Sequence, residues 1–158
     1  MIEAKKFYLT KEGIERLKKE YQNLQSLKAI KTGEEMPKIL HSEELNPEYL
    51  SLQEDLGLLD YRISELKEII ENFELIKTPL KEERNIVHLG ATVTLQEAQG
   101  KINEFMIVGS LEANPNEGKI SSESPVGKAL LGKKIGSEVI IISPIRVVYK
   151  IKKIRYLS

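Results

Sequence analysis

The sequence predicts an α+β protein in which an antiparallel α-helical hairpin, residues 1–77, precedes a small antiparallel-sheet domain, residues 78–158. Two changes of pattern along the chain support this division. Before residue 74, apolar residues recur at alternating intervals of three and four, the seam spacing of a coiled coil. After residue 86 they recur at every second position, which is typical of half-buried strands. A proline-containing segment of mixed charge, residues 78–84, separates the two patterns.

The longest predicted helix covers residues 47–73. Asn46 is a suitable N-cap, Pro47 stands where no N–H is needed, and Glu48 meets the positive end of the helix dipole. At 1.5 Å per residue the helix is roughly 40 Å long. Its apolar stripe needs a partner helix, and it consists of Tyr49, Leu52, Leu56, Leu59, Ile63, Leu66, Ile70 and Phe73.

The partner helix is predicted from Thr10, as its N-cap, to about Lys31. Its seam residues are Ile14, Leu17, Tyr21 and Leu24, and the simplest geometry folds it antiparallel against the second helix. The turn between the helices, near residues 33–48, is acidic. Residues 34–55 contain seven carboxylates and a single lysine, Lys38. The hairpin is therefore expected to end in an acidic tip.

The second half of the chain begins with two predicted strands. The run from Val87 to Leu95 alternates strictly, and the run from Phe105 to Leu111 continues the period after a turn at Gln99-Gly100. The two runs are expected to pair as a hairpin.

A short helix and two further strands complete the predicted domain. Ser124 caps the helix, Pro125 opens it and Gly132 closes it. The continuous apolar run Val139–Ile142 predicts a central strand. The next strand alternates from Ile145 onward, and Lys152-Lys153 breaks its alternation as a β-bulge would.

Composition excludes several classes of site. The chain has no cysteine, so disulfides, thiolate metal sites and a cysteine nucleophile are excluded. Its two histidines, His41 and His88, fall in different predicted domains, which disfavours a two-histidine metal site or a histidine-based triad. The segment Gly127–Lys134 has the spacing of a phosphate-binding loop, but Lys134 stands where the magnesium-binding Ser or Thr belongs.

The overall charge is balanced, but its distribution is not. Residues 1–75 contain 11 basic and 16 acidic side chains, a balance of −5, and the remainder contains 13 and 8, a balance of +5. The basic C-terminal segment suits an acidic protein surface or a nucleic-acid backbone, and equally a solvated strand edge protected by lysines. The chain contains no apolar run of eighteen residues and no signal sequence at its N-terminus, so a cytoplasmic protein without a membrane partner is expected.

Several motifs together resemble the bacterial Gre transcript-cleavage and elongation factors, the GreA-like branch in particular. They are Tyr8-Leu9-Thr10-Lys11-Glu12-Gly13, Asn46-Pro47-Glu48-Tyr49, Arg62-Ile63, Gly90-Ala91-Thr92-Val93 and the segment from Ser124 to Gly132. The resemblance covers essentially the whole chain. It implies that the sheet domain has the FKBP-like fold and serves for docking, with Ser124, Pro125, Gly127 and Gly132 as docking residues.

The resemblance also implies a function. Such a protein is not itself an enzyme: it docks on bacterial RNA polymerase and inserts its coiled coil into the secondary channel. There, tip carboxylates help to hold a magnesium ion of the polymerase active site, which cuts backtracked RNA. The implied partners are the polymerase and, only within the elongation complex, the nascent RNA 3′ end and DNA. The protein has no cofactor of its own and is expected to be a monomer.

The tip departs from the family's cleavage motif, Gly-Asp-Leu-x-Glu-Asn. Alignment of its Asn on Asn46 places His41, Ser42 and Leu45 at the positions of the Gly, the Asp and the Glu. The only carboxylates between these positions are Glu43 and Glu44, to which the metal-binding role is assigned by proximity. The tip motif is completed by Glu48 and Tyr49, which match the family directly.

Two functions therefore stay open at the level of sequence. The first is a cleavage-stimulating elongation factor that acts through Glu43 and Glu44. The second is a regulator that occupies the secondary channel and inhibits the polymerase without stimulating cleavage, because its tip is altered. A more distant alternative, a coiled-coil dimer unrelated to polymerase, would sediment as a stable dimer.

Overall fold

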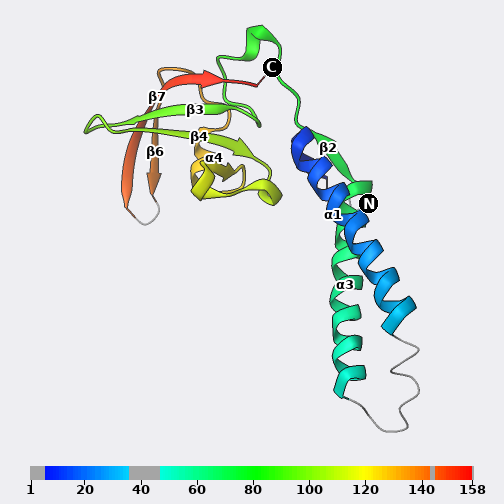
Figure 1. Ribbon diagram of the computed structural model, residues 1–158. Helices are drawn as coiled ribbons and strands as arrows, with labels where there is room; N and C mark the ends of the chain where they lie inside the picture. Colours follow the sequence, from blue (N-terminus) through cyan, green and yellow to red (C-terminus); the bar gives the residue numbers. More distant parts are fainter. Residues whose placement is uncertain (1–5, 36–46, 143–144, 158) are drawn as a thin grey trace, which may run out of the picture. The chain divides into compact units, whose positions relative to one another are not determined.

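The computed structural model describes residues 6–35, 47–142 and 145–157 (Figure 1). The chain forms two compact units. The first contains Glu12–Phe73, and the second contains Phe7–Lys11 together with the chain from Glu74 onward. The predicted α+β class is confirmed, because a helical hairpin precedes a curled sheet. No helix in the described ranges is both long enough and apolar enough to cross a membrane.

The first unit is the helical hairpin. Helix α1 runs from Lys11 to Ile30 and passes into a π-helical turn, Lys31–Glu35, and helix α3 runs from Pro47 to Glu71. All the predicted seam residues of both helices are buried or half-buried, and Ile14, Leu52 and Leu66 are at most 4% exposed. The predicted helices and their apolar seam are thus confirmed, except at the C-terminal end of the second helix, because α3 ends at Glu71 and Phe73 lies in the strand Phe73–Leu75.

The second unit is built on five strands. They are β3 (Thr92–Glu97), β4 (Ile102–Val108), β5 (Lys119–Ser121), β6 (Glu138–Ile142) and β7 (Arg146–Arg155), in the order β5-β4-β3-β7-β6. All neighbours are antiparallel except β4 and β5, which are parallel. Helix α4 (Pro125–Leu130) covers one face of the sheet, and its Leu130 joins the core of inward-facing strand residues.

Shorter elements lie outside the five-stranded sheet. Strands β1 (Phe7–Leu9) and β2 (Phe73–Leu75) form a separate two-stranded sheet. Three 3₁₀ turns, η2 (Lys81–Glu83), η3 (Ser110–Glu112) and η4 (Pro115–Glu117), lie in the connections.

The predicted strand Val87–Leu95 is wrong in its first half, because β3 begins only at Thr92. Gly90 has a φ of 93°, outside the range of a strand, and the Ala91 N–H donates to the His88 carbonyl at 3.0 Å to close a turn. Val87 is buried, but its N–H donates to Lys133 rather than to a strand of the sheet. Val87 and Ala91 are both buried, so apolar residues alternate in the sequence here although the backbone is not an extended strand.

The second predicted strand extends too far. Strand β4 ends at Val108, and Leu111 lies in a 3₁₀ turn with its side chain 47% exposed. The chain turns at Gly109, where a Cβ would lie 2.3 Å from the Tyr8 carbonyl oxygen. The predicted pairing of this strand with the first is confirmed by the register Thr92↔Met106 to Gln96↔Ile102.

The prediction that Val139–Ile142 is a central strand is also wrong, because β6 lies at the edge of the sheet. Val139 and Ile141 are buried, whereas Ile140 and Ile142 are 51% and 72% exposed. An apolar run indicates a strand buried on both faces only if both faces are covered, and α4 covers one. The predicted bulge is confirmed, since Thr94 pairs with Lys153 and Leu95 with Ile151, which leaves Lys152 as the extra residue.

Candidate functional site

Ion pairs across the hairpin fix the direction of its two helices. Lys28 pairs with Asp60, Lys31 Nζ lies 3.8 Å from an Asp55 oxygen, and Arg62 pairs with Glu20. As the residue number rises on α1 it falls on α3, which confirms the antiparallel arrangement predicted from the sequence. The hairpin consists of these two helices side by side, so it is a narrow rod (Figure 1).

Arg62 is the most highly connected charge of the rod. Its guanidinium donates to both carboxylate oxygens of Glu20 on α1, at 2.8 and 3.1 Å, and to Glu65 on its own helix at 2.9 Å. These bonds, first of all the one to Glu20, raise the pKa of Arg62 above its ordinary value, because both carboxylates favour the charged form. The two-pronged bond restricts sliding of one helix along the other.

The start of α3 forms one side of the predicted tip. Glu48 is exposed in the first turn of α3, and Tyr49 is half-buried. The Gln53 amide donates to the Tyr49 hydroxyl at 2.8 Å, one helical turn away. This bond fixes the Tyr49 side chain against the next turn of α3.

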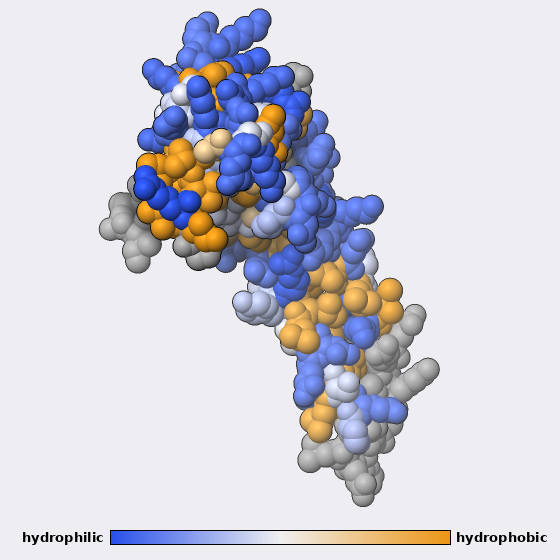
Figure 2. Space-filling model, turned by 90° about the vertical axis from the view of Figure 1, so that its left-hand side faces the viewer, coloured by the Kyte–Doolittle hydropathy of each residue, from blue (hydrophilic) through white to orange (hydrophobic). Residues whose placement is uncertain are grey.

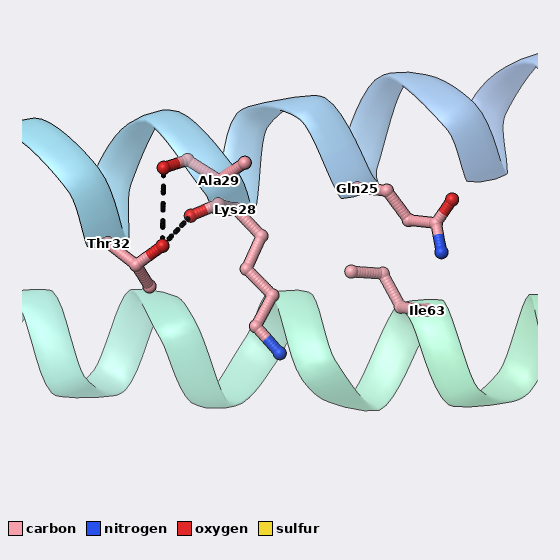
Figure 3. A pocket seen from close by; sticks show the side chains of 5 residues that line it. All are labelled: Gln25, Lys28, Ala29, Thr32 and Ile63. Atoms are coloured by element: carbon pink, nitrogen blue, oxygen red, sulfur yellow. Dashed lines mark hydrogen bonds between the residues drawn. The ribbon is translucent and has the colours of Figure 1, made fainter.

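A hollow of about 290 Å³ lies between the helices in the distal half of the rod (Figure 3). Gln25, Lys28, Ala29 and Thr32 line it from the side of α1, and Ile63 lines it from α3. The Thr32 hydroxyl turns back to donate to the carbonyls of Lys28 and Ala29, at 2.9 and 3.2 Å. Such bonds compete with the regular helical ladder and accompany the change to a π-helical turn. None of these five lining residues is a carboxylate.

One serine side chain stabilises the start of α4. Ser124 Oγ accepts from the Gly127 N–H at 3.1 Å and donates to the Ser121 carbonyl at 2.6 Å. It therefore caps the helix, as predicted, with Pro125 in the first turn. Nearby, Ser110 Oγ lies 2.8 Å from Ser121 Oγ and donates to Glu123 at 3.0 Å, which makes a polar surface beside the cap.

Two glycines of this segment are required by its backbone. A Cβ on Gly127 would lie 2.1 Å from the Ser121 carbonyl oxygen, so no side chain fits there. Gly132 has a φ of 81°, and its N–H donates to the Val87 carbonyl at 2.8 Å. Gly127 is buried, whereas Pro125 and Gly132 are exposed.

The described residues contain no group of three or more His, Asp or Glu side chains able to hold a metal ion. His88 lies beside Tyr156, whose hydroxyl accepts from the His88 N–H at 2.8 Å and donates to the Ile86 carbonyl at 2.5 Å. Burial raises the pKa of Tyr156 above its ordinary value, although the bond from the His88 backbone opposes the shift. This arrangement holds the turn before β3.

Comparison with known proteins identifies the family. The model for the N-terminal domain of transcription elongation factors matches residues 7–75, and the model for the C-terminal domain of GreA/GreB matches residues 82–156. Transcription elongation factor GreA of Thermomicrobium roseum is 36% identical over 138 residues, which cover 86% of this chain and 88% of that protein. GreA of Shouchella clausii is 37% identical over 147 residues, 91% of this chain and 92% of that protein. The chain belongs to the GreA/GreB family of transcription elongation factors.

Among solved structures, GreA factor homolog 1 (Gfh1) of Thermus thermophilus matches with a TM-score of 0.43 and 23% identity. The match covers 96% of this chain and 99% of that one.

In this GreA/GreB family member, the predicted site residues have different outcomes. Ser42, Glu43, Glu44, Leu45 and Asn46 lie outside the described residues, so their roles stay predictions. Glu48 and Tyr49 lie in the first turn of α3, and the four predicted docking residues lie together in and beside α4. Their docking role is likewise untested.

One buried carboxylate, Glu112, was not predicted from the sequence. Glu112 is 8% exposed and accepts from the Thr10 hydroxyl at 2.5 Å and from the Thr10 N–H at 2.7 Å. It therefore anchors the residue that precedes α1, although 102 positions separate the two in the sequence. No local pattern could have indicated this bond, because Glu112 stands between Leu111 and Ala113 with no periodic signal.

Proposed function

We propose that this protein is a transcription elongation factor that binds bacterial RNA polymerase and stimulates the polymerase's own cleavage of backtracked RNA. In this proposal the helical hairpin enters the secondary channel and presents its acidic tip to the active site. The main support is the narrow, ion-paired rod in a chain of the GreA/GreB family. Helix α3 has 25 residues, which corresponds to roughly 37 Å.

The shape of the rod suits a long and narrow channel. Its thickness is that of two helices, and ion pairs flank the seam at three levels, through Glu20, Lys28 and Lys31 of α1 and its extension. Exposed pairs contribute little free energy each, but the two-pronged pair of Arg62 adds geometric specificity. A rod of this kind transmits a push along its axis without a wide body.

The chemistry of the tip suits magnesium. Magnesium keeps several water ligands and takes one or two carboxylates from a protein, and in two-metal sites it stabilises the attacking and leaving oxygens of a phosphodiester. We assign the carboxylates to Glu43 and Glu44, which would contribute ligands only inside the polymerase complex. Because the rod is removable, the additional ligands are present only when cleavage is required.

The proposal is tested by RNA length in backtracked polymerase complexes. The protein is added with magnesium, beside the double variant Glu43→Ala/Glu44→Ala and the matched double variant Glu82→Ala/Glu83→Ala. The control removes two adjacent carboxylates from η2, in the other unit. We expect shortened RNA with wild type and control, and none with the tip variant, although all three bind the polymerase.

Two other outcomes would contradict the proposal in different ways. Slowed synthesis without shortening, together with binding, would identify a channel-occupying inhibitor. Failure of the wild-type protein to bind polymerase would reject the partner itself.

A further inference from the structure

Glu112 is the one charged side chain that is buried among the residues that the structure describes. The other charged side chains of these residues are exposed or partly exposed, and much of the face shown in Figure 2 is hydrophilic. A buried carboxylate costs free energy unless hydrogen bonds replace the water that it loses. Thr10 supplies two such bonds, one to each carboxylate oxygen, from its N–H at 2.7 Å and from its hydroxyl at 2.5 Å.

The turn that carries Glu112 also contacts strand β1. The turn η3 follows Gly109, and a Cβ on Gly109 would lie 2.3 Å from the Tyr8 carbonyl oxygen, so the two backbones touch. Leu9, the next residue of β1, is fully buried. The segment that leads into α1 is therefore held in the sheet unit by a backbone contact, by burial and by the two bonds of Thr10 to Glu112.

Both ends of the hairpin continue into the sheet unit through β1 and β2. The segment Phe7–Lys11 precedes the hairpin and the chain from Glu74 follows it, and both belong to the sheet unit. Strands β1 and β2 pair, and beyond them the Ile76 N–H donates to the Leu9 carbonyl at 2.9 Å. Ile76 packs closely on Gly90, where a Cβ would lie 2.8 Å from its Cγ2. Because the two strands pair, an anchor on β1 restrains both ends of the hairpin.

The length of the rod amplifies any freedom at its base. Helix α3 has 25 residues and is roughly 37 Å long, so a rotation of about 5° at the base moves the far end by about 3 Å. Groups that take part in catalysis have to be held within about 0.5 Å of their productive positions. Magnesium adds to this requirement, because it demands near-ideal octahedral geometry from its ligands. A rod that presents metal ligands at its far end therefore needs a rigid base.

We propose that Glu112 is a positioning residue for RNA cleavage: it holds Thr10, restrains the base of the rod and so limits the movement of the tip. The inference rests on the proposed function for the reaction that the rod serves. Glu112 touches neither the RNA nor the metal in this role. A carboxylate suits it, because its two oxygens hold both donors of Thr10 at once and a negative charge is favourable at the N-terminal end of α1.

The first test measures the rate of RNA cleavage in backtracked polymerase complexes over a range of protein concentrations. The variants are Glu112→Gln and Thr10→Val. The matched controls are Glu117→Gln, which changes an exposed carboxylate in η4, and Thr10→Ser, which keeps the hydroxyl. Glu112→Gln keeps the shape of the side chain, and its amide oxygen still accepts one bond, so the fold is expected to persist; circular dichroism checks this for every variant.

We expect Glu112→Gln and Thr10→Val to lower the maximal cleavage rate by about tenfold or more, because a small displacement of a catalytic group is costly. The protein concentration that gives half of the maximal rate should stay within about twofold of wild type, since binding to the polymerase is not altered. Both controls should behave as wild type.

The second test measures the freedom of the rod itself. The chain has no cysteine, so Glu54→Cys on α3 and Lys101→Cys before β4 provide two specific positions for spin labels. Pulsed electron spin resonance then gives the distribution of distances between the two labels. We expect a broader distribution when Glu112→Gln is added to this labelled protein, and an unchanged one when Glu117→Gln is added.

The outcomes distinguish positioning from stability. A lower Tm in Glu112→Gln with an unchanged maximal rate and an unchanged distance distribution would show a purely structural role and overturn the inference. A change confined to the half-maximal concentration would place Glu112 in polymerase binding, and a reduced rate in Thr10→Val alone would reflect the lost cap of α1; either result would also overturn it. These results leave the proposed function intact, whereas absence of RNA shortening with wild type would reject both.

Discussion

The two units of this protein are stabilised in different ways. Among its described residues, the hairpin buries four large apolar side chains, Ile14, Leu52, Leu66 and Ile69, along a seam flanked by surface ion pairs. In the described part of the sheet unit, a core cluster of ten buried residues joins the strands of the five-stranded sheet to α4. An isolated helix pair gains most of its stability from its apolar seam. The hairpin is therefore expected to open locally at a lower free energy than the sheet unit.

The difference follows the proposed division of labour. A rod that enters a channel has to be narrow, so each of its residues has few neighbours to bury it. A docking unit has no such limit and can hold a core several strands wide. Most of the stability is therefore expected in the sheet unit, which is free to be several strands wide.

The largest effect is expected from a charge in the seam of the hairpin. Leu66 is fully buried, and Leu66→Asp places an unpaired carboxylate there, at a cost of about 3–5 kcal/mol. Because the seam has few buried residues, we expect this variant to lose the hairpin while the sheet unit stays folded. Far-UV circular dichroism should show the loss of helix, and hydrogen exchange should retain protection in β3 and β7.

The matched control is Glu68→Asp, an exposed acidic position two residues away on the same helix. It should leave the helical signal and the Tm nearly unchanged. Loss of protection in the sheet of the Leu66→Asp variant would show that the two units unfold as one, and it would remove the contrast between them.

A smaller effect is expected from the central ion pair. Arg62→Met keeps the apolar stem but removes the bonds to Glu20 and Glu65, and the free energy of unfolding should fall by about 0.5–1 kcal/mol, since the groups are partly exposed. The loss should shrink in 1 M salt because screening has already weakened the wild-type pair. Thermal melts at low and high salt measure it.

Lys67→Met is the matched control, because Lys67 is exposed on the same helix and forms no ion pair with the rest of the described chain. A double-mutant cycle with Glu20→Gln isolates the pair itself. An equal loss in the Lys67 variant, or no change of the loss with salt, would indicate that Arg62 acts through its apolar stem alone.

Local signals in the sequence predicted much of this architecture. The seam was predictable because a coiled coil repeats one short pattern along a continuous segment, and all its predicted members are shielded in the structure. The cap of α4 was predictable for a similar reason, since Ser124 and Gly127 are three residues apart and bond directly. Both features depend on neighbours in the chain.

Features that depend on distant residues were missed or misplaced. The apolar run of β6 gave no information on which strands flank it, so its edge position and the exposed Ile140 and Ile142 were not anticipated. The alternation at Val87 persisted through a turn because the segment still packs inward. The bond between Thr10 and Glu112 joins segments that only the complete fold brings together.

A third expected effect is confined to the sheet unit and depends on pH. Burial raises the pKa of Tyr156 above its ordinary value of 10.0, which means that folding favours the neutral phenol. Its contribution to stability is complete below pH 10.0 and is lost as the pH rises through the raised pKa of the folded state. Tyr156→Phe removes the bonds to Ile86 and His88, at a cost of about 0.5–1.5 kcal/mol at neutral pH.

The difference in unfolding free energy between wild type and Tyr156→Phe should therefore become smaller above pH 10.0. The wild type loses the contribution of its neutral phenol there, whereas the variant has no phenol to ionise. Urea unfolding at several pH values measures this difference. Tyr149→Phe is the comparison, because the pKa of Tyr149 is also raised, by burial and then by the charge of Glu97. A Tyr156 difference that stays constant to pH 11 would show that folding does not raise the pKa of this phenol, and that the hydroxyl bonds alone account for its contribution. The hairpin should be unaffected in either variant, since both tyrosines lie in the sheet unit.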